Sequence, residues 1–175
     1  VQPDTFMGYR RKDGKVGIRN EVWIIPTVGC VNAIAKQIED QSQQFMTSEL
    51  DGIYSYSHPY GCSQLSQDHL NTQLALAGLV KHPNAAAVLV LGLGCENNSI
   101  EEFKKVLGKT DDDSDKLLIC QEHEDEVGEA VKIVSQLCQY AASFKREPCG
   151  TDNLIVGLKC GGSDGFSGIT ANPLV

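Results

Sequence analysis

Three short motifs in the chain share the pattern glycine, cysteine, any residue, amide. They occupy residues 29–32, 61–64 and 94–97, with the sequences GCVN, GCSQ and GCEN, and they are almost evenly spaced. A fourth thiol, Cys160, begins the glycine-rich stretch 160–168. Glycine lets a backbone approach a bound group closely, and short polar side chains supply donors and acceptors without bulk. The pattern therefore suits loops that meet around one ligand.

Three kinds of role are open to these cysteines. Cysteine packs as a small buried hydrophobe, it ligates metals or iron–sulfur clusters as the thiolate, and it acts as a nucleophile where a helix N-terminus lowers its pKa. The chain has no C-x-x-C pair, which argues against an iron–sulfur cluster, although separate loops can still bring thiols together. Only His58 and His69 lie near a cysteine in sequence, and neither is placed beside one by the spacing alone.

Other candidate groups are ionisable or basic. His58 precedes a proline after an expected strand, where imidazole could serve as acid, base or metal ligand, or equally as a capping or core residue. Glu96 and Asp164 offer oxygens to a divalent cation, and each also fits an ordinary turn or surface position. A basic group near the N-terminus fits either an anion site or a solvated turn. Its members are Arg10, Arg11, Lys12, Lys15 and Arg19.

The hydrophobic pattern predicts the elements that must position these residues. Apolar or alternating runs predict strands at 21–28, 53–57, 85–93, 116–120 and 153–158. Helical spacing predicts helices at 31–45, 65–81, 99–107 and 125–145. This alternation indicates an α/β fold, a Rossmann-like three-layer α/β/α sandwich with a mostly parallel sheet of about five strands. Ligands bind such sheets beyond the carboxyl ends of the strands, where the motifs lie.

Composition limits the class of protein and its partners. At 175 residues we expect one α/β domain over 21–175, preceded by a polar lead-in segment over 1–20. The net charge of −8 and the pI near 4.9 argue against a nucleic-acid partner, and no apolar run is long enough for a membrane span. The odd number of cysteines, seven, argues against a disulfide framework and for a reduced, cytoplasmic protein.

Four separated motifs, in order, give the chain a resemblance to a known family. They are residues 8–20 (GYRRKDGKVGIRN), 58–64 (HPYGCSQ), 92–97 (GLGCEN), and 160–164 (CGGSD) together with 168–173 (GITANP). Together they resemble the altronate/galactarate dehydratase family, which includes the large subunits of sulfolactate sulfo-lyases. The resemblance covers the chain from about residue 6 to its end.

The resemblance implies a lyase that removes water from a sugar acid to give a 2-keto-3-deoxy acid with the help of a divalent metal. We expect Fe2+ as this metal, ahead of Mn2+ or Mg2+, and no iron–sulfur cluster. Proton removal next to a carboxylate creates a dianion, which needs a metal or cationic donors. The corresponding candidates fall into three groups. The acid or base is sought at His58 and Asp164; substrate binding at Arg10, Arg19, Asn20, Ser163, Thr170 and Asn172; and metal ligation at Cys62, Cys95, Glu96 and Cys160.

The resemblance also implies a longer enzyme, since family members carry chain on both sides of this region. We therefore expect a fragment whose partners are a small-molecule sugar acid, the other domains of the parent enzyme and further copies in a homo-oligomer. Two alternatives stay open. One is a sulfo-lyase acting on sulfolactate by the same α-proton chemistry, and the other is a non-catalytic structural or oligomerisation domain of such an enzyme.

Overall fold

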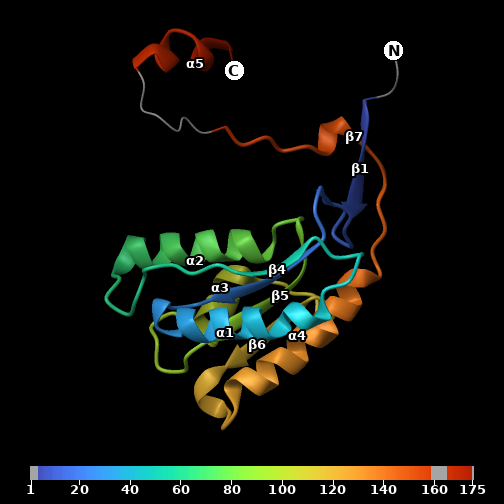
Figure 1. Cartoon of the computed structure of the whole chain (residues 1–175). Coiled ribbons are helices and arrows are strands. Elements are labelled where there is room, and N and C mark those ends of the chain that lie inside the picture. Colours follow the sequence, from blue (N-terminus) through green and yellow to red (C-terminus); the bar gives the residue numbers. More distant parts are fainter. Residues whose placement is uncertain (1–3, 159–164, 175) are drawn as a thin grey trace.

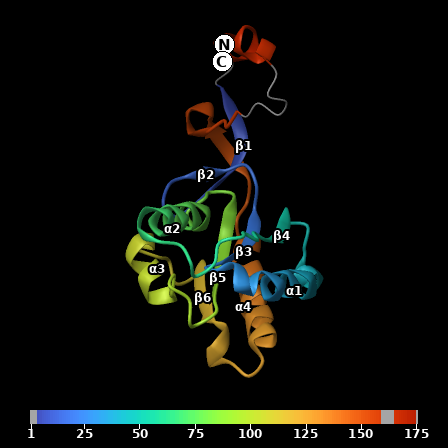
Figure 2. The same ribbon diagram turned by 90° about the vertical axis from the view of Figure 1, so that its left-hand side faces the viewer.

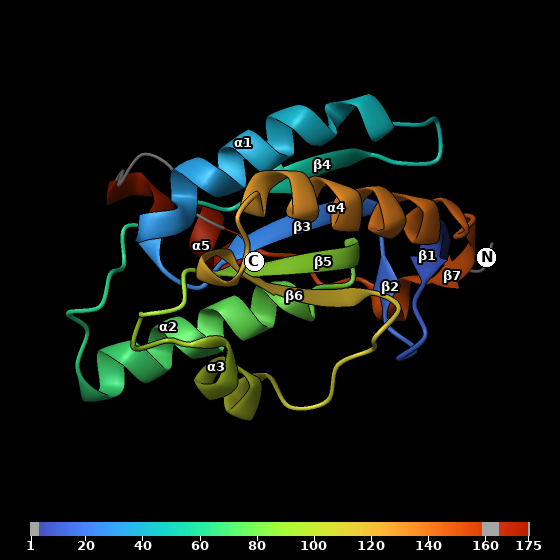
Figure 3. The same ribbon diagram turned by 90° about the horizontal axis from the view of Figure 1, so that it is seen from below.

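The computed structural model describes residues 4–158 and 165–174 of the chain. Its centre is a parallel sheet of four strands in the order β4-β3-β5-β6, flanked by helices on both faces (Figures 1 and 3). The strands are β3 (Glu21–Pro26), β4 (Gly52–Ser55), β5 (Ala85–Gly92) and β6 (Asp115–Ile119). The helices are α1 (Asn32–Ser42), α2 (Ser66–Val80), α3 (Ile100–Leu107) and α4 (Glu126–Ala142). The expected α/β sandwich is confirmed.

Two apolar clusters hold the three layers together, one on each face of the sheet. Helices α1 and α4 cover one face, where Ile24, Ile38 and Leu137 are fully buried. Helices α2 and α3 cover the other face, where Phe103 and Ile25 are fully buried. Burial of each such side chain contributes roughly 1.5–3 kcal/mol. Because β3 and β5 face helices on both sides, their sequences are continuous apolar runs rather than alternating ones.

The helix ends follow the expected capping chemistry. Ser99 accepts a hydrogen bond from the backbone N–H of Glu102 at the start of α3. Asp125 does the same for the N–H of Gly128 at the start of α4. Short 3-10 turns extend the ends of several elements: η1 (Gly29–Val31) precedes α1, η2 (Gln43–Phe45) follows it, and η3 (Cys120–Glu122) follows β6.

A separate antiparallel sheet contains the first strands of the chain. Strand β1 (Thr5–Arg10) lies between β2 (Val16–Gly17) and β7 (Glu147–Gly150), in the order β2-β1-β7 (Figure 2). The N-terminal stretch that the sequence suggested as a polar lead-in thus includes two strands. Strand β7 returns the chain from α4 to pair with β1, with Phe6 opposite Cys149.

One predicted strand is wrong. The run 153–158 was expected as the fifth strand of the parallel sheet, but Thr151–Asn153 forms a 3-10 turn, η4, and 154–158 has no regular structure. The parallel sheet therefore has four strands, and the segment lies outside it (Figures 1 and 2). The last described elements are η5 (Gly165–Gly168) and α5 (Ala171–Leu174). Within the described part of the chain, none of the helices has the length and apolar character that a membrane span requires.

Candidate functional site at the carboxyl edge of the sheet

The order of the strands creates a crevice between β3 and β5. The chain goes from β3 to β4 on one side and then returns to β5 on the other side of β3, so the strand order reverses at this point. The loops after β3 and β5 leave the sheet in opposite directions there, which makes it the usual ligand site of such sheets. All four strands are parallel, so the three G-C-x-amide motifs lie at this same carboxyl edge.

Two motif amides hold the loop between His58 and Cys62 in place. The Asn32 side chain donates through Nδ2 to the carbonyl oxygen of His58 at 2.8 Å, and the Asn97 side chain donates in the same way to the carbonyl of Cys62 at 2.5 Å. Asn32 thus clamps one end of the loop, and Asn97 clamps the other. The amides of the outer two motifs thus hold the loop that leads into the middle motif.

Gly29 lets this loop approach the end of β3. Its N–H donates to the carbonyl of Tyr60 at 2.7 Å, and a Cβ at this position would lie 2.9 Å from the carbonyl oxygen of His58. Any larger residue would push the loop away. Gly29 therefore allows the two loops to pack closely. Asn32, three residues later, then holds the second loop in place through its hydrogen bond to His58.

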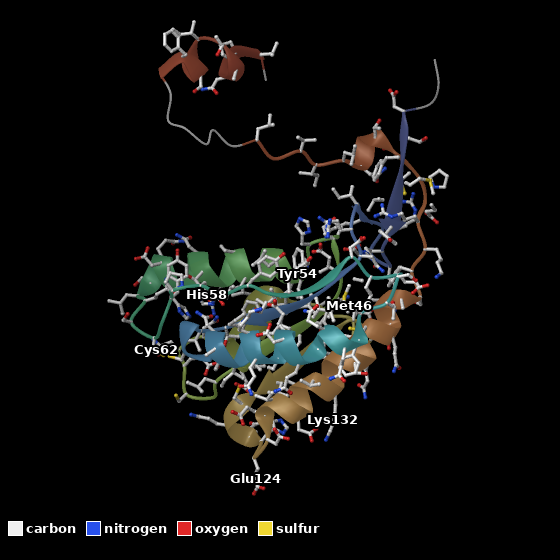
Figure 4. The ribbon with its side chains drawn as sticks, in the orientation of Figure 1. Met46, Tyr54, His58, Cys62, Glu124 and Lys132 are labelled. Atoms are coloured by element: carbon white, nitrogen blue, oxygen red, sulfur yellow. The ribbon has the colours of Figure 1, made fainter. Side chains whose placement is uncertain are left out.

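The ring of His58 is held by the backbone on both sides. Its Nε2 lies 3.0 Å from the carbonyl of Pro26, and its Nδ1 accepts from the N–H of Tyr60 at 3.3 Å. A carbonyl only accepts, so Nε2 carries the proton and Nδ1 has the lone pair. Figure 4 labels His58 and Cys62 at this end of the molecule. A half-buried imidazole in this tautomer can take up a proton at Nδ1 while Pro26 continues to accept from Nε2.

Glu96 is buried, and its carboxylate organises the loop after β5. It accepts hydrogen bonds from the Thr27 hydroxyl at 2.7 Å, from the N–H of Leu93 at 2.9 Å and from the N–H of Gly94 at 2.5 Å. Burial disfavours the charged form, but these hydrogen bonds outweigh it and lower the pKa of Glu96 below its usual range. Glu96 therefore ties the end of β3 to the end of β5 across the crevice as an ionised group.

A second buried bond joins this crevice to helix α2. The Asn98 side chain donates to the carbonyl of Thr27 at 3.0 Å and accepts from Gln73 of α2 at 2.9 Å. Asn98 and Gln73 are both buried. Sequence reasoning missed Thr27, Gln73 and Asn98, because single polar residues in apolar or helical runs carry no signal of their own. The amides of the motifs were the one usable signal, since the same position recurs in all three.

The thiols separate into two groups. The edge thiols Cys30, Cys62 and Cys95 are exposed, whereas Cys120, Cys138 and Cys149 are buried. Burial raises the pKa of Cys120 and of Cys138 to about 11, so these two are core residues. Cys95 lies 3.8 Å from the Nε2 of Gln121, which donates to its sulfur.

The described residues do not by themselves form a metal centre. They contain no group of three or more His, Cys, Asp or Glu side chains suited to hold a metal ion. Among the expected ligands, Glu96 already uses its oxygens to bind backbone and hydroxyl donors. Cys62 and Cys95 are exposed at the edge, and Cys160 lies outside the described residues.

The three expected carboxylate-binding residues near the N-terminus lie at the opposite, amino edge of the sheet. Arg10 on β1 pairs with Glu147 at 2.7 Å, and Arg19 pairs with Glu21 at the start of β3. Asn20 is fully buried, where it donates to the carbonyls of residues 49 and 141. The structure thus does not bring these three together with His58 and the edge thiols.

Asn20 also binds a buried guanidinium at this amino edge. Arg11 donates to its side-chain oxygen at 2.9 Å and to the carbonyls of Pro83 and Arg19, both at 2.8 Å. Burial lowers the pKa of Arg11 to about 10, still far above neutrality. One member of the basic group, Arg11, therefore has a structural role: it joins the turn after β1 to the start of β3 and to the turn before β5.

The C-terminal candidates are placed differently again. Thr170 and Asn172 are exposed. Thr170 lies in the turn between η5 and α5, and Asn172 lies in α5, apart from the parallel sheet (Figures 1 and 2). The Thr170 hydroxyl donates to the carbonyl of Phe166 at 2.9 Å. Ser163 and Asp164 lie outside the described residues. Of the expected site residues, the structure therefore gathers His58, Cys62, Cys95 and Glu96 at one edge.

Comparison with known families agrees with the motifs. The family described as D-galactarate dehydratase/altronate hydrolase, second domain, matches residues 8–142. The family described as D-galactarate/altronate dehydratase, C-terminal, matches residues 151–175. The first match contains the whole parallel sheet and its helices, and the second begins directly after β7.

Three curated proteins illustrate the similarity. Altronate dehydratase of Escherichia coli is 50% identical over 95% of this chain and 34% of its own length. Altronate dehydratase of Bacillus subtilis is 47% identical over 98% of the chain and 35% of its own length. The (2R)-sulfolactate sulfo-lyase subunit beta of Chromohalobacter salexigens is 34% identical over 98% of the chain and 42% of its own length. The chain thus spans between a third and about two fifths of these relatives.

Proposed function

The chain belongs to the D-galactarate dehydratase/altronate hydrolase family, and we propose that it is the part of a hydro-lyase that presents catalytic loops to a sugar acid. The reaction would remove water from an aldonate or aldarate, such as altronate or galactarate, to give a 2-keto-3-deoxy acid. The names of the relatives support this substrate class. The observation that carries the proposal is the convergence of the three motif loops at the crevice between β3 and β5.

His58 is our candidate for the proton transfer. Its Nδ1 has the lone pair, and the hydrogen bond from Nε2 to the carbonyl of Pro26 would stabilise the ring after it gained a proton. The hydrogen bond that Nδ1 accepts from the N–H of Tyr60 is long, at 3.3 Å, and a substrate could replace it. Asn32 and Asn97 would act as positioning residues, because each holds one end of the loop that carries this ring.

The loops at the carboxyl edge lack the positive charge that the proposed reaction needs. Removing the α-proton of a carboxylic acid builds up a second negative charge, which needs cationic or metal stabilisation. The loops 27–31, 56–65, 93–99 and 120–125 contain no Lys or Arg, and they carry several acids. The expected cations lie at the amino edge instead. A complete site would therefore need groups from outside these loops.

A divalent metal is our proposal for part of that need, with Fe2+ ahead of Mn2+ or Mg2+. When bound, such an ion would stabilise negative charge on the substrate. The described residues do not supply its full ligand set. Cys62 and Cys95 remain candidates, with Cys160 and Asp164 from beyond the described residues, and the other domains of the parent enzyme would complete the site.

The likeness to a sulfo-lyase subunit favours one alternative function. The same proton removal would then expel sulfite from a sulfonated hydroxy acid such as sulfolactate. Recognition of the leaving group would distinguish the two reactions. Altronate, galactarate and sulfolactate should therefore be tested side by side.

The test uses the full-length parent enzyme, prepared without oxygen and loaded with ferrous iron or manganese. Release of the 2-keto acid is measured from each substrate, beside His58→Ala and Asp164→Ala variants. His82→Ala, at an exposed histidine in the turn before β5 at the amino edge of the sheet, is the matched control. We expect the first two variants to lose at least about 100-fold in kcat while they stay folded. Normal turnover by His58→Ala would make this domain a scaffold and refute the assignment.

A further inference from the structure

The segment 154–158 is an apolar run left in solvent. Its sequence is LIVGL, and it follows the η4 turn in an extended conformation. Ile155 is 94% exposed, Val156 is 74% exposed and Leu158 is 67% exposed. Scattered exposed apolar residues are common, but a continuous apolar run in this state is typical of a surface that another element covers.

The composition of the run indicates which kind of element covers it. Five residues without a polar interruption, two of them β-branched, are typical of a strand buried on both faces of a parallel sheet. Neither sheet of this chain includes the segment. Its backbone N–H and C=O groups therefore find no strand partner among the described residues, although the side chains are those of a central strand.

Helix α2 carries a second uncovered apolar surface. Its inner face buries Leu76, Ala77 and Val80 against the sheet. On the outer side of the helix, next to this buried face, Leu70 and Leu74 are exposed one turn apart. An apolar stripe that extends beyond the buried face of a helix is usually covered by a further element. In Figure 1 the chain after β7 runs above α2, which is the uppermost of the four helices around the parallel sheet in that view.

The family comparison identifies the part of the chain that could cover both surfaces. A separate C-terminal family region begins at residue 151, three residues before the run, and the curated relatives are more than twice as long as this chain. We propose that 154–158 is a strand of a second parallel sheet, whose other strands come from the following part of a longer parent polypeptide. The domain built on that sheet packs against the outer face of α2. This proposal is independent of the reaction proposed above.

Hydrogen exchange tests the strand directly. Amide exchange is compared between the 175-residue chain and the full-length parent protein. We expect the amides of 154–158 to exchange at least about tenfold more slowly in the full-length protein, because they gain strand partners there. The amides of β5 should be slow in both proteins, and those of the loop 111–113 should be fast in both. Equal, fast exchange of 154–158 in both proteins would overturn the proposal.

A charge placed in the run gives a second readout. Val156→Lys should lower the Tm of the full-length protein by about 5 °C or more and leave that of the 175-residue chain unchanged, because the lysine is buried only in the former. Met46→Lys, at an exposed apolar residue beyond α1, is the control and should change neither. If 154–158 is already protected in the 175-residue chain, and light scattering gives the mass of a dimer, a second copy pairs with the run and the proposal is wrong.

Discussion

Replacing Glu96 by glutamine should loosen the crevice between β3 and β5. The carboxylate accepts from three donors, the hydroxyl of Thr27 and the N–H groups of Leu93 and Gly94. In glutamine one oxygen becomes an NH2 group, which faces a backbone N–H and cannot accept from it. One hydrogen bond to a charged group is lost, and the buried N–H is left without a partner. The free energy of unfolding should therefore fall by about 2–3 kcal/mol.

Urea unfolding and thermal unfolding measure this loss. For a domain of this size, about 2–3 kcal/mol corresponds to a decrease in Tm of roughly 4–12 °C. Glu124→Gln, at an exposed acid without a described hydrogen-bond partner, is the matched control and should shift the Tm by less than about 1 °C. A double-mutant cycle with Thr27→Val should give a coupling of about 1 kcal/mol, since the two side chains share a bond.

The pH dependence of the same variant checks the charge. The hydrogen bonds lower the pKa of Glu96 in the folded state, so its contribution to stability is complete above the unfolded pKa, near 4.5. This contribution is lost as the pH falls through the lower folded value. The difference between wild type and Glu96→Gln should thus be constant from pH 7 to about 5 and should shrink below pH 4.5. Equal stability of the two proteins at pH 7, with no coupling to Thr27, would refute the structural role of this carboxylate.

Three further outcomes follow from the buried and exposed groups. Asn20→Ala should destabilise the fold by about 2–4 kcal/mol in urea, because two carbonyls and a guanidinium lose their partner; an unchanged unfolding midpoint with weaker substrate binding would instead make Asn20 a substrate ligand. Asn97→Ala should speed hydrogen exchange in the loop 58–62 about fivefold, and unchanged exchange would show that the clamp is unimportant. A disulfide reagent at pH 8 should label the edge thiols within minutes and leave Cys120 and Cys138 unmodified, as mass spectrometry of the labelled peptides would show.

The parallel sheet was predictable because the sequence of each strand is recognisable without reference to its neighbours. Strands such as β3 and β5 are continuous apolar runs with glycine just beyond their ends, and a strand buried on both faces needs little else to be recognised. The run 153–158 carries the same signal, yet it forms no strand among the described residues. Periodicity reports that a segment is suited to burial, and it does not report whether a partner strand lies in the same chain. The short strands β1, β2 and β7 were missed since each depends on its antiparallel partner rather than on its own composition.

The place of the candidate site residues at the carboxyl edge was predictable, but the contacts that they make there were not. The repeated motifs and the rule of carboxyl ends correctly brought His58, Cys62, Cys95 and Glu96 to one edge. What could not be read from residue types was whether a polar group already has a partner. Glu96 is satisfied by backbone donors, and Asn20 is satisfied by carbonyls, because the fold brings residues from distant parts of the sequence to them.

The separation of charge between the two edges of the sheet supports an incomplete site. The amino edge holds Arg10, Arg11 and Arg19, but Arg11 is buried in hydrogen bonds and the other two are paired with glutamates. The carboxyl edge holds a histidine in a defined tautomer and exposed thiols, in loops without Lys or Arg. An anionic sugar acid at these loops would meet proton-transfer groups without a counter-charge. The charge balance of the proposed reaction thus leads to the same proposal as the exposed apolar run 154–158: both would be completed by protein beyond these loops.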